Sequence, residues 1–371
     1  MSVWFRTFAA AVLTMVGCLV APGAMPRAAQ AQTPIILDVD LSHFADDHEA
    51  LAMAAELHRR GRVRILGVTL VAGNDWMDQI VVDALRAVER QGLAGDVPVF
   101  RGAEQPLVHS QERFLRDKAL YGAIYAGAWS LDNSVTPPPD GPVRSARLAD
   151  GHAVDFLIDA VRAAPGQVTV LALGPLTNLA IAVRKAPDIV PLIGQVIYMG
   201  GAVHVPGNVT AAAEFNWWFD PEAAAIVLAA PMRHTVVPLD ATDRILFRRN
   251  LYDRFVQAHP GDVMVTQFLK PKFAERLERE PAYTIPVWDA LVPALLADPA
   301  VVAAERDYWI GVDAEAGPNY GRTIADPVEP GEQAGPYGTR RARVILRLNE
   351  PAFWDIYEDL MFVGIDEPER E

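Results

Sequence analysis

The chain has 371 residues, of which 51% are hydrophobic and 22% are charged, and its formal charge at pH 7 is −14. These values are typical of a globular protein, and the length corresponds to one large domain or two ordinary ones. The acidic balance argues against nucleic acid or an anionic membrane as a partner.

The first 31 residues have the pattern of an export signal. Arg6 ends a short amino-terminal region, residues 8–20 are apolar, and Ala29-Gln30-Ala31 fits a small-residue cleavage site. We therefore predict a signal peptide over residues 1–31, a mature domain over 32–371, and a periplasmic or secreted location. No later run is apolar and long enough for a membrane span, so we expect no membrane contact after cleavage.

After the signal, short apolar strands alternate with amphipathic helices. The expected strands are 35–37, 64–71, 97–100, 168–173, 196–199, 234–238, 308–312 and 343–348. The expected helices include 50–57 and 80–88, and then 150–163, 176–186, 221–229, 248–280, 286–297 and a last one from Pro351. This alternation indicates βαβ units, so we predict a single α/β domain with a largely parallel, Rossmann-like open sheet flanked by helices.

Residues 101–149 interrupt the alternation. They contain Pro137-Pro138-Pro139, several glycines and scattered aromatic residues. A stretch this long with weak periodicity is either a lid over an active site or a helical excursion from the main fold.

Four carboxylates lie between the first strand and the first helix, at Asp38, Asp40, Asp46 and Asp47. Open α/β sheets bind their ligands at the carboxyl ends of their strands, which is where this group lies. Like charges this close would repel one another unless a cation neutralised them. Oxygen ligands without cysteine favour a hard ion, Ca²⁺ or Mg²⁺. A solvated acidic turn at a helix start would have the same pattern, and the four residues alone do not decide between the two.

Two further positions could supply ligands to such a cation. Gly174-Pro175-Leu176-Thr177-Asn178 follows a strand and opens a helix, which leaves the carbonyl of Leu173 free at the strand end. Asp289 follows Trp288 at the start of an apolar helix. It is either a helix cap or a further carboxylate for the metal.

A turn-rich loop at 207–216 gathers two amides and a carboxylate, at Asn208, Glu214 and Asn216. Such a set suits hydroxyl groups, because each hydroxyl needs a donor and an acceptor. A loop built from Asx turns would contain the same residue types.

In this order along the chain, the motifs resemble those of the inosine–uridine-preferring nucleoside hydrolase family. The family's acidic opening is matched by 38–47, its Gly-Asn turn by Gly73-Asn74 and its Gly-Pro-Leu-Thr-Asn turn by 174–178. The remaining matches are the Met-Gly-Gly strand end at 199–201, the loop with Asn208 and 214–216, the late aspartate Asp289, and Gly321-Arg322-Thr323. Together they span most of residues 34–324.

The resemblance implies a nucleoside-hydrolase-like fold and Ca²⁺-dependent hydrolysis of the N-glycosidic bond of ribonucleosides to free base and ribose. It assigns Asp40, Asp47, Asp289 and the carbonyl of Leu173 to the ion. Asp40 would also act as general base toward the attacking water. A nucleoside is then the expected partner, and a homo-oligomer is compatible with the sequence.

The resemblance also assigns the residues around the sugar. Asp46 and Asn216 would bind the 2′- and 3′-hydroxyls, and Asn74, beside them, belongs to both the catalytic and the sugar-binding set. The 5′-hydroxyl would be held by Asn208 and Glu214. Met199 would line the sugar pocket.

Trp288 departs from the family's pattern, since many members carry there a histidine that protonates the leaving base. An indole cannot donate that proton usefully. The family's purine-specific members stack the base between indoles, so the resemblance favours purine nucleosides and counts Trp288 as catalytic. The second aromatic would be Trp76, Tyr121, Tyr125 or Trp129. Core packing of Trp288 at a helix start is the structural alternative.

Two departures lie in the acidic opening, where Ser42 replaces a glycine and Phe44 an aspartate. If the backbone needs φ > 0 at position 42, serine strains it. With Trp288, these departures motivate a second hypothesis, an exported protein that binds nucleosides but has lost catalysis.

A third hypothesis is a haloacid-dehalogenase-type phosphatase. Asp38-Val39-Asp40-Leu41-Ser42 fits that class's motif, with Asp38 as nucleophile and Asp40 as acid and base. That class also needs a lysine and an acidic pair at later strand ends. The strand ends near 173 and 199 instead have Gly-Pro and Gly-Gly.

Overall fold

Nine strands form one sheet in the computed structural model, which describes residue 1 and residues 32–122, 127–130 and 134–363. They are β1 Thr33–Val39, β2 Val63–Leu70, β3 Val99–Phe100, β4 Thr169–Ala172, β5 Gln195–Met199, β6 His234–Val237, β9 Val302–Val312, β10 Thr323–Pro327 and β11 Arg340–Leu348. Their order is β10-β9-β11-β6-β5-β4-β1-β2-β3. All neighbours from β11 to β3 are parallel, and β9 is antiparallel to both of its neighbours. The prediction of a largely parallel sheet is confirmed.

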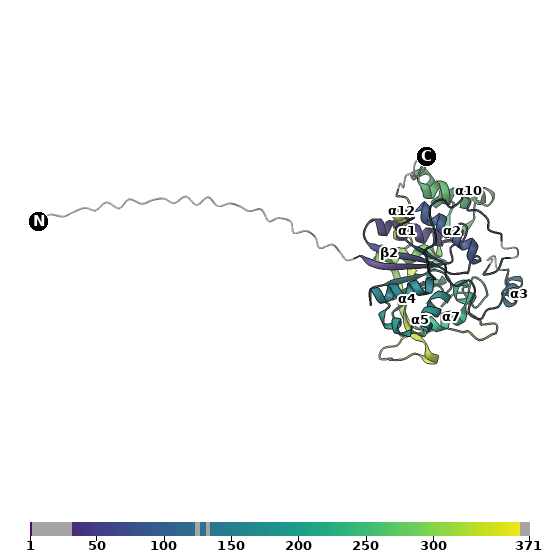
Figure 1. Ribbon diagram of the computed structural model, residues 1–371, viewed down its shortest axis with the longest axis vertical. Coiled ribbons are helices and arrows are strands. Elements are labelled where there is room, and N and C mark those ends of the chain that lie inside the picture. The colour runs from purple at the N-terminus through teal and green to yellow at the C-terminus, as the bar shows by residue number, and fades with distance from the viewer. Residues whose placement is uncertain (2–31, 123–126, 131–133, 364–371) are drawn as a thin grey trace. The chain divides into compact units, whose positions relative to one another are not determined.

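Helices cover both faces of this sheet. The α-helices of the described residues are α1 Asp47–Arg59, α2 Met77–Arg90, α3 Gln111–Tyr121, α4 Ala153–Ala163, α5 Thr177–Lys185, α6 Phe215–Phe219, α7 Pro221–Leu228, α8 Leu239–Thr242, α9 Arg249–Ala258, α10 Lys270–Arg279, α11 Leu291–Ala297 and α12 Glu350–Met361. In Figure 1, α1, α2, α10 and α12 lie on one side of the sheet and α4, α5 and α7 on the other.

The apolar core is divided by the sheet into two layers, and β1 contributes to both. Ile35, Leu37 and Val39 pack in the layer with α1 and α2, whereas Ile36 packs in the layer with α4 and α5. Side chains alternate along a strand, so a strand covered on both faces must be apolar throughout. This explains the continuous apolar run that marks β1 in the sequence.

The strand order reverses beside β1. From β1 the chain moves outward through β2 to β3, and from β4 it moves the opposite way through β5 to β6. Chain connections therefore leave β1 and β4 in opposite directions, which opens a crevice above their carboxyl ends. The crevice is where an open α/β sheet binds its ligand.

Several element boundaries differ from the prediction. The helix expected over 248–280 is divided into α9, a π-helical turn at Val265–Leu269 and α10, because Pro260-Gly261 cannot continue α9. A small antiparallel pair of strands, β7 Leu246–Arg248 and β8 Thr284–Pro286, flanks this helical region. The edge strand β10 was not predicted. It is only five residues long, and its sequence shows no clear alternation of apolar and polar residues.

Residues 101–149 contain α3 among their described part. The hydroxyl of Ser110 accepts a hydrogen bond from the amide of Arg113 at its start, and Gly122, at φ 72°, ends it. The helical excursion predicted for this stretch is confirmed, and the lid stays a prediction. Residues 134–146 then lie along α2, where Gln79 exchanges hydrogen bonds with the backbone of Thr136.

The predicted signal segment falls on residues that lie outside the described ones, apart from Met1. A single compact unit begins at Gln32. Within the described ranges, no helix is both long and apolar enough to cross a bilayer.

Candidate active site

A small cavity of about 50 Å³ lies at the carboxyl ends of the central strands. Ten of the eleven residues predicted for the site line it, and Phe215 is the one further residue. The ten are Asp40, Asp46, Asn74, Leu173, Met199, Asn208, Glu214, Asn216, Trp288 and Asp289. Asp47 adjoins the cavity through its carboxylate, which lies near those of Asp46 and Asp289. Residues far apart in the sequence thus meet because the ends of parallel strands share one edge of the sheet.

Asp40 is held against two glycine turns. One of its oxygens, Oδ2, accepts a hydrogen bond from the backbone amide of Asn74 at 2.8 Å. A Cβ atom on Gly73 would lie 2.2 Å from that oxygen, and one on Gly174 would lie 2.9 Å from Oδ1. Glycine is therefore required at both positions by the close approach of the Asp40 carboxylate.

Asp46, Asp47 and Asp289 form a tight carboxylate cluster. One oxygen from each lies within 4.8 Å of the others. Both oxygens of Asp47 are buried without a hydrogen-bond partner among the described residues, whereas Oδ2 of Asp46 accepts from the amide of Asp289 at 3.2 Å. Burial, and then the neighbouring carboxylates, raise the pKa of Asp47 and of Asp289 well above the ordinary value.

This cluster fits a hard divalent cation. Buried oxygens without partners are costly unless something binds them, and grouped carboxylates are ligands that Ca²⁺ prefers. The resemblance assigned Asp40 to the ion with Asp47 and Asp289, and Asp46 to the sugar. In the structure Asp46 lies with Asp47 and Asp289 in the tight cluster, and Asp40, whose Oδ2 accepts from the amide of Asn74, lines the same cavity. The assignment of Asp40 to the ion and of Asp46 to the sugar stays a prediction.

Asn216 joins the ends of two neighbouring strands. Its Nδ2 donates to the carbonyl of Leu173, after β4, at 2.7 Å and to that of Met199, at the end of β5, at 3.1 Å. These two bonds hold the amide in one orientation on the wall of the cavity. The lone pair that remains on the Leu173 carbonyl is compatible with the cation role predicted for it.

Glu214 caps the amino terminus of α6. Its carboxylate accepts from the backbone amides of Asn216 at 2.7 Å, Gly201 at 2.9 Å and Trp217 at 3.1 Å. Asn208, from the same loop, accepts from the amide of Phe215 at 2.9 Å. The loop predicted to bind hydroxyl groups is therefore a capping structure, and its role toward hydroxyl groups stays a prediction.

Trp288 lies on a 3₁₀ turn at Trp288–Ala290 and is half-buried. Its indole N–H donates to Oδ1 of Asp243 at 3.3 Å, and the side chain both packs against the core and lines the cavity. Of the candidate second aromatics, Trp129 packs on Phe114 with ring centroids 5.3 Å apart. The side chain of Tyr121 and all of Tyr125 lie outside the described residues.

Comparison with known proteins decides the family. A family model described as inosine-uridine preferring nucleoside hydrolase matches residues 35–355. The chain belongs to this family. It is 32% identical to the pyrimidine-specific ribonucleoside hydrolase RihB of Shigella sonnei, and 31% identical to that of Escherichia coli strain SE11. Each comparison covers 88% of this chain and 96% of the relative.

Solved nucleoside hydrolases have the same fold. A purine-preferring ribonucleoside hydrolase from Gardnerella vaginalis is 27% identical, with a TM-score of 0.67 over 88% of this chain and 98% of its own. An inosine-guanosine nucleoside hydrolase is 24% identical, with a TM-score of 0.73 over 89% and 99%. The second likeness shows the fold alone.

In this nucleoside hydrolase Asp38 has a structural role near the cavity. It is fully buried, does not line the cavity, and accepts hydrogen bonds from Thr69 Oγ1 at 2.6 Å and Asn178 Nδ2 at 2.8 Å. A carboxylate enclosed in this way cannot reach a phosphate ester, so the phosphatase hypothesis is wrong.

Asn178, whose role the sequence reasoning missed, also binds the carbonyl of Leu70 and the amide of Ala103. Its place in the Gly-Pro-Leu-Thr-Asn motif was the available signal.

Within the acidic opening, the residue in the left-handed backbone region is Phe44 rather than Ser42. Phe44 has φ 53°, and its ring packs edge-on against Phe268 with centroids 5.9 Å apart. An aromatic residue in the left-handed region costs on the order of 1–3 kcal/mol, and surrounding contacts must compensate for it. Neither Ser42 nor Phe44 is among the residues that line the cavity.

One nearby cation was also missed. Lys272, on α10, lies 3.5 Å from the buried carboxylate of Glu49, and its charge lowers the pKa of Asp46 against the larger effect of burial. It offsets part of the negative charge around the cluster. No signal in the sequence distinguishes Lys272 from the other basic residues of α10.

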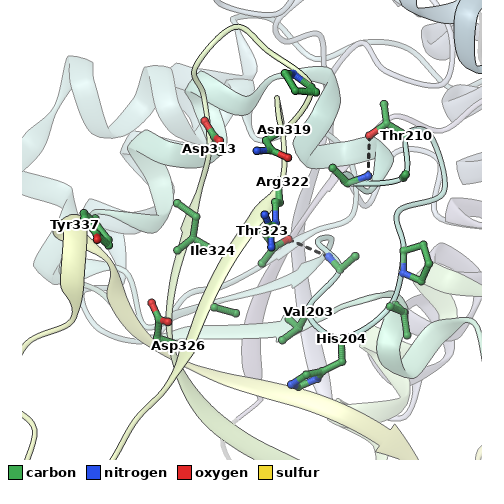
Figure 2. Close-up of a pocket in the computed structure, with 17 residues that line it drawn as sticks. Val203, His204, Thr210, Asp313, Asn319, Arg322, Thr323, Ile324, Asp326 and Tyr337 are labelled. Carbon is green, nitrogen blue, oxygen red and sulfur yellow. Dashed lines mark hydrogen bonds between the residues drawn. The ribbon is translucent and has the colours of Figure 1, made fainter.

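A larger cavity, of about 1000 Å³, is lined in part by residues 202–206 and 210–212, which flank Asn208 in the sequence (Figure 2). Among the described residues that line it, none belongs to the predicted site. Thr323 of its wall accepts a hydrogen bond from the amide of Ala202 at 3.0 Å, as Figure 2 shows. A Cβ atom on Gly321 would lie 2.5 Å from the backbone of Trp218. The Gly321-Arg322-Thr323 element therefore packs against two segments that follow β5, at Ala202 and at Trp218.

The metal-free hydrolase should become more stable as the pH falls toward 5.5. Burial raises the pKa of Glu214 to about 7 and those of Asp75 and Asp220 to about 6. The folded state therefore binds these protons more tightly than the unfolded state, and the stability they contribute at low pH is lost as the pH rises through 6 to 7. We expect thermal denaturation in a chelator to give a higher midpoint at pH 5.5 than at pH 7.5.

An Asp75→Asn variant should reduce this slope, because one of the three groups no longer titrates. Asp159→Asn, at an exposed position of α4, is the matched control and should retain the slope. A midpoint that falls steadily from pH 7.5 to pH 5.5 would show that the buried carboxyl groups do not govern stability in this range.

Proposed function

We propose that this protein hydrolyses the N-glycosidic bond of ribonucleosides to free base and ribose, and that it depends on Ca²⁺. The observation that carries the proposal is the state of the Asp47 carboxylate. Both of its oxygens are buried close to Asp46 and Asp289, and neither has a hydrogen-bond partner among the described residues. Asp40 and the Leu173 carbonyl line the same cavity and complete an all-oxygen donor set. Ca²⁺ takes six to eight oxygen ligands, so substrate hydroxyls and water would supply the others.

The side chains of the cavity would perform the remaining steps. When bound, the cation supplies positive charge that offsets the carboxylates and lowers the pKa of water. Asp40, oriented by the Asn74 amide, takes the proton of the attacking water as general base. Asn216 and Asp46 bind the 2′- and 3′-hydroxyls, and Asn208 and Glu214 bind the 5′-hydroxyl.

The carboxylates would also stabilise the transition state. As the bond to the base breaks, positive charge develops on the ribose ring. The buried anionic groups are already in position before the reaction, so they interact with that charge without reorganising. This electrostatic effect needs the cavity to be closed to bulk water, and most of its acidic residues are buried.

We further propose a preference for purine nucleosides. The proposal rests on Trp288, which lines the cavity as an aromatic wall with its N–H engaged by Asp243. A purine offers a larger π-face to such a wall than a pyrimidine does. Pyrimidine specificity is the second candidate, favoured by the names of the RihB relatives.

A protein that binds nucleosides without hydrolysis is less well supported. Two of the three departures that motivated it, Ser42 and Phe44, do not line the cavity. The carboxylate of Asp40, the proposed general base, is held in place by the amide of Asn74.

We also propose that residues 1–31 are an export signal for the periplasm or the exterior. Amino-terminal sequencing of protein recovered from the producing cells should then read from Gln32.

Release of free base from inosine, guanosine and uridine tests the proposal. We expect turnover that a chelator abolishes and that added Ca²⁺ restores, with inosine and guanosine preferred over uridine. If the protein binds Ca²⁺ and releases no base from any of the three, the hydrolase proposal is wrong. Faster release from uridine would contradict only the purine preference.

A further inference from the structure

A line of buried hydrogen bonds reaches the loop that delivers Asp46 and Asp47. Residues 42–46, called here the acidic loop, connect β1 to α1. The carbonyl of Ser42 in this loop is 3.0 Å from Nε2 of His48, and Nδ1 of His48 is 3.1 Å from Nη1 of Arg90. Arg90 in turn donates to Oδ2 of Asp140 through Nε at 3.1 Å and Nη2 at 2.8 Å. The line joins α1, α2 and the 134–146 segment to the acidic loop.

The hydrogen-bond partners of His48 determine which of its ring nitrogens carries the proton. A guanidinium can only donate, so Nδ1 of His48 must accept the bond from Arg90. The ring proton is then on Nε2, from which it donates to the Ser42 carbonyl. The side chains of Arg90 and Asp140 are 3% and 2% exposed, so water cannot readily replace either partner. Each member of the line orients the next.

The acidic loop needs such support. It contains Phe44 in the left-handed region, and its own backbone contributes a bond from the Ala45 amide to the Ser42 carbonyl at 3.1 Å. The same carbonyl therefore accepts both from the loop and from His48. A shift of this turn would move Asp46 and Asp47 away from Asp289 and open the carboxylate cluster.

His43 makes a second connection from the acidic loop to the same surroundings. Its Nδ1 bonds to Asp83 of α2 at 2.6 Å, and its Nε2 lies 3.2 Å from the carbonyl of Pro137. Both links therefore run from the loop to α2 and the 134–146 segment. Among the described residues, α2 and this segment thus form the frame against which the loop is placed.

We propose that His48, Arg90 and Asp140 are positioning residues that preorganise the cation site by holding the acidic loop at Ser42. They do not touch the cavity themselves and act through the loop. The inference rests on the cation site of the proposed function. Residues that orient metal ligands typically change metal affinity 10- to 100-fold when they are lost.

Calorimetric titration of the full chain with Ca²⁺ tests the inference with two variants of one position. His48→Leu removes both bonds, and we expect about 10- to 100-fold weaker Ca²⁺ affinity. His48→Gln keeps a donor for Ser42 and an acceptor for Arg90 at similar spacing, and its affinity should stay within about threefold of wild type. If His48→Leu does not fold, Asp140→Asn should weaken affinity in the same direction by releasing Arg90.

A matched control separates positioning from general stability. His152, which caps α4 on the opposite face of the sheet, accepts a bond from the amide of Val154 at 3.2 Å and takes no part in this line. His152→Ala should lower the melting temperature in a chelator and leave Ca²⁺ affinity unchanged. A folded His48→Leu protein with wild-type affinity, or a His48→Gln protein as impaired as His48→Leu, would overturn the inference. Wild-type protein that binds no Ca²⁺ would overturn the cation site of the proposed function as well.

Discussion

Replacing Asp47 with asparagine should abolish Ca²⁺ binding and yet stabilise the metal-free protein. Both oxygens of Asp47 are buried near Asp46 and Asp289, with no hydrogen-bond partner in the part of the chain that the structure describes. A neutral amide at this position removes a repelling charge and can donate to those carboxylates. Relief of an unsatisfied buried group is worth about 1–3 kcal/mol. Loss of a charged ligand should lower kcat/KM by a factor on the order of 10² to 10³ or more.

Thermal denaturation with and without Ca²⁺ measures both effects. For wild type, Ca²⁺ at 100 times its Kd should stabilise the fold by about 2.7 kcal/mol, whereas for Asp47→Asn it should have no effect. Asp159→Asn, on the surface of α4, controls for the loss of one negative charge and should behave as wild type. A Ca²⁺-induced rise in the melting temperature of Asp47→Asn equal to that of wild type would remove Asp47 from the cation site.

Replacing Trp288 with alanine should lower turnover of purine nucleosides while leaving Ca²⁺ affinity intact. The indole lines the cavity, and its N–H is fixed by Asp243. Stacking of a base on an aromatic side chain is worth about 1–3 kcal/mol by alanine substitution. We therefore expect kcat/KM for inosine to fall about 10- to 100-fold. The comparison is made from initial rates of base release for inosine and uridine.

Trp288→Phe is the matched control for the aromatic wall. It keeps a ring against the cavity and removes the bond to Asp243, so it should retain most of the activity toward inosine. If Trp288→Ala lowers inosine and uridine turnover equally, Trp288 contributes to packing and not to base selection. The core-packing alternative would then be correct.

Much of the fold follows from local patterns in the sequence. The apolar run at 35–37 and its counterparts predict strands covered on both faces, and their alternation with helices predicts a parallel sheet. The edge strand β10 and the division of the 248–280 helix were missed. Short edge strands and π-helical turns depend on tertiary contacts that leave little periodicity in the sequence.

The composition of the cavity was predictable for a related reason. Asp40, Leu173 and Met199 each stand at or just beyond the end of a strand, and β1, β4 and β5 are neighbours in the sheet. Residue types and order along the chain therefore indicated which side chains meet. Their individual roles stay predictions until the variants above are measured.

The sequence by itself determined the class of fold, the family and the set of residues around the cavity, because these depend on patterns within single elements. Only the tertiary structure showed that Asp46 lies in the tight cluster with Asp47 and Asp289, and that Phe44 rather than Ser42 has a left-handed backbone. The direction of a carboxylate is set by turns from other strands, here those at Gly73 and Gly174. Those turns approach Asp40 only once the sheet is assembled.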